Sequence, residues 1–114
     1  MPLDATRQAV LERRALESAL AKTPGTVAAR IRRITDGALR IDEAQGKRGM
    51  SLHDPLAVGV ALDPTLAEWE AVRLAIGPDG QTRRAAGEPN CRFARVVDAR
   101  RFLKLFLDRL WPAS

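Results

Sequence analysis

The sequence predicts a mixed α/β fold made mostly of helices, with two or three strands in its second half. Apolar residues recur at helical spacing through the first half of the chain and again near the C-terminus. Between about residues 69 and 97, short runs with many β-branched or aromatic residues are bounded by glycine, proline and asparagine, which is typical of strands. The length of 114 residues fits one domain or a piece of one.

The first half is predicted to form a turn followed by two helices. Residues 2–6 are expected to be the end of a strand or a turn. Residues 12–20 have the pattern of a helix with Leu16 and Leu20 on one face, and the run TPG ends it. A second helix is expected over about 26–39, with Thr26 as its N-cap. The apolar stripe of that helix comprises Val27, Ala28, Ile31, Ile34 and Ala38.

A polar segment of about residues 41–52, which contains two glycines, is predicted to be a flexible loop. A helix should follow it, because Asp54 is a good N-cap and Pro55 is favoured at the first helical position. Residues 56–62 are apolar or glycine on every side, as expected of a helix that is buried all round. It should end before Pro64, because proline cannot continue a helix.

The strands are predicted in the second half, separated by runs rich in glycine and proline. They are expected at 69–76, from about 81–83 onward, and at 92–97. In the last of them, Phe93 and Val97 should face the core.

Asp98 is predicted to cap a closing helix, which Pro112 ends. The buried stripe of this helix consists of apolar residues at helical spacing: Phe102, Leu103, Phe106, Leu107 and Leu110. Leu105 lies off the stripe and is expected to face a second surface. So few strands around a fully apolar helix make a poor self-contained domain, which indicates that residues 1–114 form a single partial domain.

Composition excludes several classes of protein. No apolar run is long enough to cross a membrane, and the N-terminus has no apolar secretion signal. The single cysteine, Cys91, excludes an internal disulfide, so a cytoplasmic location is expected. The net charge of +5 raises nucleic-acid binding as a hypothesis. The arginines are scattered in pairs and aromatic residues are few, which makes a nucleic-acid partner the least favoured interpretation.

His53 and Asp54 are the candidates for chemistry. A carboxylate at a helix start is a suitable ligand for a hard metal ion, and the ordinary pKa of histidine suits proton donation near neutral pH. The alternative is that Asp54 only caps the helix and His53 is an ordinary loop residue. Local pattern alone leaves both interpretations open.

The run HDPLAV at 53–58, followed by ALDP at 61–64, resembles the C-terminal signature of the inosine–uridine type nucleoside hydrolases. Two other segments agree in order: PLDATRQ at 2–8 looks like the Gly-Leu-Asp-x-Thr segment of that family, and RVVDARRF at 95–102 looks like its last strand and closing helix. The resemblance covers nearly the whole chain.

The resemblance implies the C-terminal portion of a Rossmann-like open α/β sheet, and a calcium-dependent enzyme that cleaves the bond between ribose and a purine or pyrimidine base. It implies that His53 protonates the departing base and that Asp54 is a Ca²⁺ ligand. The substrate would be a ribonucleoside.

The sequence also departs from the family pattern. The N-terminal cluster Asp-x-Asp-Pro-Gly-x-Asp-Asp, the threonine-bearing calcium loop and the Glu-Phe-Asn ribose segment are absent. Tyrosines that cover the base are absent too, and residues 40–48 leave base preference open. We therefore expect the chain alone to be inactive, as a truncated gene product, a misread start or half of a split enzyme. It would depend on a complementary N-terminal chain or on a homo-oligomer. A non-catalytic interaction module is the alternative.

Overall fold

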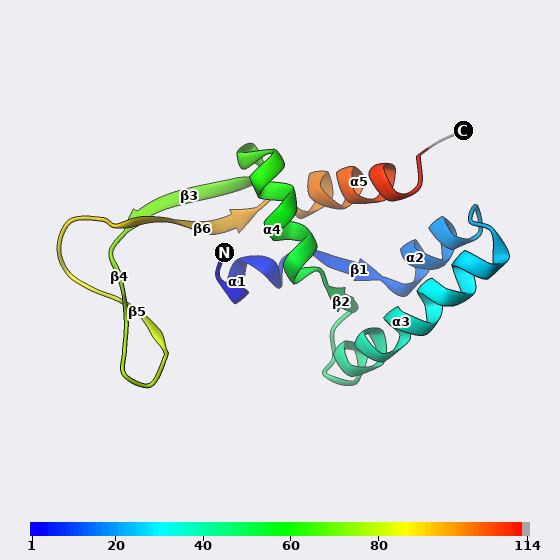
Figure 1. Cartoon of the computed structure of the whole chain (residues 1–114), viewed down its shortest axis with the longest axis horizontal. Coiled ribbons are helices and arrows are strands. Elements are labelled where there is room, and N and C mark those ends of the chain that lie inside the picture. Colours follow the sequence, from blue (N-terminus) through cyan, green and yellow to red (C-terminus); the bar gives the residue numbers. More distant parts are fainter. Residues whose placement is uncertain (113–114) are drawn as a thin grey trace.

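The structure, a computed structural model, describes residues 1–112, which form five helices and six short strands (Figure 1). In order they are α1 (Leu3–Thr6), β1 (Val10–Glu12), α2 (Arg13–Leu20), α3 (Gly25–Ala44), β2 (Gly49–Ser51), α4 (His53–Leu62), the 3₁₀ turn η1 (Pro64–Leu66), β3 (Ala67–Val72), β4 (Leu74–Ile76), β5 (Thr82–Arg84), β6 (Cys91–Val97) and α5 (Ala99–Leu110). The α/β class is confirmed. The strands are more numerous than predicted, and residues 2–6 include a short helix where a strand end or turn was expected.

The strands pair antiparallel in three separate two-stranded ladders, β1 with β2, β3 with β6, and β4 with β5. Strand β2 lies in the segment predicted to be a flexible loop, and β1 ends at Glu12, where a helix was expected to begin. Because α3 ends at Ala44 and β2 begins at Gly49, only residues 45–48 connect them without regular structure. Gly49 is buried at the start of β2, and a side chain there would collide with the backbone of Leu11. The close approach of β1 and β2 therefore requires glycine at this position.

The core lies where α4, α5, η1 and the β1–β2 ladder meet. Leu11, Leu56, Leu66 and Phe102 are almost completely buried there. A Cβ atom on Gly59 would lie 2.8 Å from the Phe102 ring, so the glycine lets α4 and α5 approach closely.

Two N-cap predictions are wrong. Thr26 lies inside α3, whose N-cap is Pro24. No side chain caps the start of this helix. Asp54 is the second residue of α4, whose N-cap is Leu52, and Pro55 is the third. Proline is still tolerated there, because the first backbone N–H groups of a helix have no partner inside it. The cap at Asp98 is confirmed, since its carboxylate accepts the Arg101 N–H at 3.0 Å.

The helices bury narrower faces than predicted. In α4, Leu56, Gly59 and Val60 are buried, but Val58 is 60% exposed and Leu62 is 72% exposed, so this helix is not buried all round. In α3, Ala28 is buried as predicted, whereas Val27 and Ile34 are exposed.

Leu39, which is outside the predicted stripe of α3, is buried instead. In α5, Phe102 is buried and Leu110 is exposed, whereas Leu105, predicted to face a second surface, packs partly against the core.

A change of register between β3 and β6 alters which side chains of β6 face the core. Glu68 pairs with Val96 and Trp69 with Ala94, which leaves Arg95 as an extra residue in the ladder. Ala94 and Val97 are therefore both buried, and Phe93 is only half-buried. The prediction was correct for Val97 and wrong for Phe93.

The molecule is elongated, with extents of 54 × 30 × 21 Å and a radius of gyration of 16.7 Å. A compact domain of this length has a radius of gyration of about 13 Å. In Figure 1 the β3–β6 ladder and the β4–β5 arm extend to one side of α4, while α2 and α3 extend to the other. No helix within residues 1–112 is long and apolar enough to cross a membrane.

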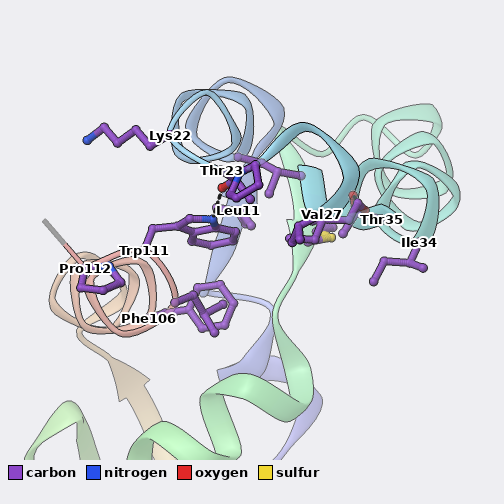
Figure 2. Close-up of a pocket in the computed structure, with 14 residues that line it drawn as sticks. Leu11, Lys22, Thr23, Val27, Ile34, Thr35, Phe106, Trp111 and Pro112 are labelled. Carbon is purple, nitrogen blue, oxygen red and sulfur yellow. Dashed lines mark hydrogen bonds between the residues drawn. The ribbon is translucent and has the colours of Figure 1, made fainter. Parts of the chain in front are cut away.

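A groove of about 700 Å³ lies between the α2–α3 hairpin and α5 (Figure 2). Val27, Ile31 and Phe106 contribute to its apolar lining. At one end the Trp111 indole N–H donates to the Thr23 hydroxyl at 2.7 Å, which links α5 to the hairpin.

Candidate active site

His53 is the first residue of α4, and its ring is held by α1. The Nδ1 atom lies 2.6 Å from the hydroxyl oxygen of Thr6, which is only 4% exposed. The backbone carbonyl of Leu3 lies 3.2 Å from the same hydroxyl. The two segments are 47 residues apart in sequence, so the fold brings them together. This contact fixes the orientation of the imidazole ring and leaves Nε2 available to contact a ligand.

The single proton of the Thr6 hydroxyl decides which tautomer is compatible with this geometry. If the hydroxyl donates to Nδ1, the neutral ring carries its proton on Nε2. If the hydroxyl donates to the Leu3 carbonyl, it accepts from Nδ1–H, and Nε2 has a proton when the ring is cationic. Only the second arrangement is compatible with a cationic ring, which can give up its Nε2 proton and return to neutral imidazole, and the Thr6–Leu3 hydrogen bond has this direction.

Thr6 is a site residue that the sequence analysis missed. It lies in the segment at 2–8 that carries the family resemblance, so the resemblance could have indicated it. The same segment is fastened to β6 by Gln8. The side-chain amide of Gln8 donates to the Arg95 carbonyl at 2.9 Å and accepts from the Val97 N–H at 2.9 Å.

Asp42 holds the chain just before His53. Its carboxylate accepts hydrogen bonds from the Lys47 ammonium group at 2.7 Å and from the Ser51 backbone N–H at 2.9 Å. The hydrogen bond from Lys47, followed by that from Ser51, lowers the pKa of Asp42, and the charge of His53 acts in the same direction. The end of α3 is thereby tied to β2 and to the start of α4.

Asp54 is exposed in the first turn of α4, where the helix dipole favours a negative charge. Within residues 1–112 there is no group of three or more histidine, cysteine, aspartate and glutamate side chains that could hold a metal ion. Ca²⁺ takes about six to eight oxygen ligands. The described residues therefore do not form a calcium site by themselves, and Asp54 offers a single carboxylate.

Charged residues near the end of α3 face other partners. Glu43 forms a bidentate contact with Arg13 at 3.1 and 3.0 Å, and Arg40 pairs with Asp36 at 3.2 Å. These ion pairs join α3 to α2 or run along α3. They contribute no aromatic surface for a base.

The arginine pairs of the sequence are largely engaged in ion pairs. Each pair has at least one member bound to a carboxylate: Arg13 to Glu43, Arg32 to Glu17, Arg84 to Glu70 and Arg101 to Asp63. Hydrogen bonding from Arg84 is the main cause that lowers the pKa of Glu70. Much of the positive charge is therefore matched locally and does not form one continuous basic face.

Two comparisons with known proteins point to one family. The family model described as inosine-uridine preferring nucleoside hydrolase matches residues 1–104. Among solved structures, a purine-preferring ribonucleoside hydrolase from Gardnerella vaginalis is similar with a TM-score of 0.82 and 28% sequence identity. The similarity covers 95% of this chain and 37% of that chain. No curated protein sequence matches. On the extent of the family match, the chain belongs to the inosine–uridine preferring nucleoside hydrolase family.

Proposed function

We propose that this chain supplies the leaving-group acid and one metal ligand of a calcium-dependent ribonucleoside N-ribohydrolase. The observation that carries the proposal is the contact between His53 Nδ1 and the buried Thr6 hydroxyl, at 2.6 Å. A general acid must be held in a fixed orientation to protonate a departing group. A histidine that was merely a loop residue would not need a buried partner from a distant segment.

In the proposed reaction, water adds to the anomeric carbon of the ribose as the bond to the base nitrogen breaks, and the proton that the water loses passes to a carboxylate outside this chain. His53 donates the proton on Nε2 to the departing base, so that ribose and the neutral base are formed. Thr6 holds the other ring nitrogen throughout. Asp54 is proposed as one Ca²⁺ ligand, and Ca²⁺ would supply binding of ribose hydroxyls and activation of water.

The remaining metal ligands are proposed to come from outside this chain, because no group of three or more histidine, cysteine, aspartate and glutamate side chains that could hold a metal ion lies within residues 1–112. The exposed apolar face of α4, at Val58 and Leu62, supports a partner that covers this helix. We propose that the partner is a segment carrying the aspartate cluster of the family, and that the assembled enzyme works in the cytoplasm.

The test is turnover of inosine, uridine and a chromogenic riboside, with and without Ca²⁺. We expect the purified chain alone to be inactive. Co-expression with the N-terminal segment of a family member that contains the aspartate cluster should give calcium-dependent activity, and His53→Ala should abolish it. Robust activity of the chain alone would contradict the dependence on a partner, and full activity of the complemented His53→Ala variant would contradict the role of His53.

A non-catalytic interaction module is the second candidate, favoured by the same apolar face of α4 and by the groove of Figure 2. In that case the chain should bind a protein partner whose association is unaffected by His53→Ala, and no complemented assembly should turn over a nucleoside. Binding and turnover measured on the same preparations separate the two functions.

A further inference from the structure

A basic hollow of about 450 Å³ lies on the side of the β1–β2 ladder that faces away from the core. Val10 pairs with Ser51 and Glu12 with Gly49, so the Val10, Glu12 and Ser51 side chains share one face of the ladder. Leu11 and Met50 point the other way and pack in the core. Arg7, Lys47 and Arg48 complete the charged lining of the hollow.

The lining holds three cations and a single carboxylate, Glu12. Arg48 is 85% exposed and reaches Glu12 only at 3.9 Å, so this ion pair holds it weakly. Arg7 has no ion pair within residues 1–112, whereas Lys47 is matched by Asp42. Two guanidinium groups at the hollow are thus available to a ligand.

Ser51 adds a hydroxyl group to the same lining. Its oxygen is buried and has no hydrogen-bond partner among the described residues. Because that oxygen is closed to solvent, a ligand in the hollow would not reach it directly. Guanidinium groups bind phosphate oxygens in a bidentate manner.

The hollow lies next to the residues proposed for chemistry. Arg7 directly follows Thr6, and Ser51 precedes His53 by two residues. The Leu52 N–H donates to the Ala9 carbonyl at 2.8 Å, which keeps the two flanking segments side by side. The segments that carry Thr6 and His53 therefore border the hollow, although neither residue lines it.

We propose that this hollow binds a phosphate group, held by Arg7 and Arg48. The phosphate could be free inorganic phosphate or belong to a ribonucleoside 5′-monophosphate whose sugar extends toward His53. The second source rests on the proposed hydrolase function. The phosphate site itself does not, because it can be measured on this chain without turnover.

The experiment is a titration of the ¹⁵N-labelled full chain with inorganic phosphate at constant ionic strength, followed by amide NMR shifts. We expect saturable shifts centred on Arg7, Arg48 and Ser51. Arg7→Ala and Arg48→Ala should each weaken binding about fivefold or more, whereas Arg30→Ala, an exposed arginine on α3, is the matched control for loss of one charge and should leave it unchanged. Absence of saturation, or equal weakening by Arg30→Ala, would overturn the site.

A second arm identifies the source of the phosphate. A nucleoside 5′-monophosphate that binds at least tenfold more tightly than inorganic phosphate, with added shifts at Thr6 and His53, would support the nucleotide. Equal affinity of the two would overturn the nucleotide assignment. Binding of inorganic phosphate should persist in His53→Ala, so that failure of the hydrolase proposal and failure of the phosphate site give different results.

Discussion

Thr6 joins two segments of the chain through one hydroxyl group. Replacing it by valine keeps the shape of the side chain but removes the hydrogen bonds to His53 and to the Leu3 carbonyl. We expect Thr6→Val to lower the free energy of unfolding by about 1 kcal/mol. Urea denaturation followed by circular dichroism measures this loss.

Thr6→Ser is the matched control, because serine keeps the hydroxyl group, and it should restore most of the lost stability. If Thr6→Val were as stable as the wild-type chain, the hydroxyl would contribute nothing to holding His53.

Residue identity alone could predict some of this site and not the rest. His53 and Asp54 were found from their position before an apolar helix and from the run that follows them. Thr6 was not, because its role depends on a contact that spans 47 residues of sequence. The start of α4 was placed two residues too late, at Pro55, since an aspartate at the N-cap and one at the second helical position look alike in sequence.

At the scale of elements, the contact between α4 and α5 depends on Gly59. A Cβ atom there would lie 2.8 Å from the Phe102 ring, which is buried and cannot move away freely. We expect Gly59→Ala to lower the free energy of unfolding by roughly 1–3 kcal/mol, as overpacking does.

Gly37, inside α3, provides the comparison, because nothing lies within 4 Å of an added Cβ atom. Gly37→Ala should raise the stability by about 0.5–1 kcal/mol, since alanine favours a helix. Thermal unfolding of both variants measures the difference, and a stabilising Gly59→Ala would contradict close packing of the two helices.

The hydrogen bonds of Asp42, which join α3 to β2, predict that the stability of the chain depends on pH. The pKa of Asp42 is lowered by its hydrogen bond from Lys47 and then by that from Ser51. Its ordinary pKa is about 3.9, so its contribution to stability is complete above that value and is lost as pH falls through the lower pKa of the folded chain. Asp42→Asn should therefore reduce the loss of stability below about pH 4.

Melting temperature measured between pH 2 and pH 6 tests this. Lys47→Met removes the largest cause of the lowered pKa and should give a profile between those of the wild type and Asp42→Asn. Parallel profiles for the wild type and Asp42→Asn would show that the tie makes no pH-dependent contribution.

Most long elements could be predicted from the sequence, and the short ones could not. α2, α4 and α5 are where periodicity, proline and the Asp98 cap indicated them, to within a few residues. β1 and β2 have three residues each, too few for an alternating pattern to show. The core face of β6 was misplaced because the extra residue Arg95 shifts the alternation, and no local pattern marks that change.

At the scale of the whole molecule, we expect the exposed apolar face of α4 to matter for binding the proposed partner and not for folding of the chain. Val58 and Leu62 lie one helical turn apart and are mostly exposed. We expect Val58→Ser with Leu62→Ser to change the free energy of unfolding of the chain by no more than about 0.5 kcal/mol per residue, because surface substitutions are mild. The same double variant should abolish activity in the complementation assay.

Leu56→Ser is the contrasting variant, because Leu56 is fully buried and this change should unfold the chain or nearly so. Retention of complemented activity by the double variant would show that α4 is not the face that the partner covers.

The elongated shape has a practical consequence for judging oligomeric state. A radius of gyration of 16.7 Å is that of a compact protein of about 200 residues. On a gel-filtration column calibrated with globular standards, a single 12.5-kDa chain should therefore elute close to the position expected of its dimer. Molar mass from light scattering, which does not depend on shape, distinguishes one copy from two.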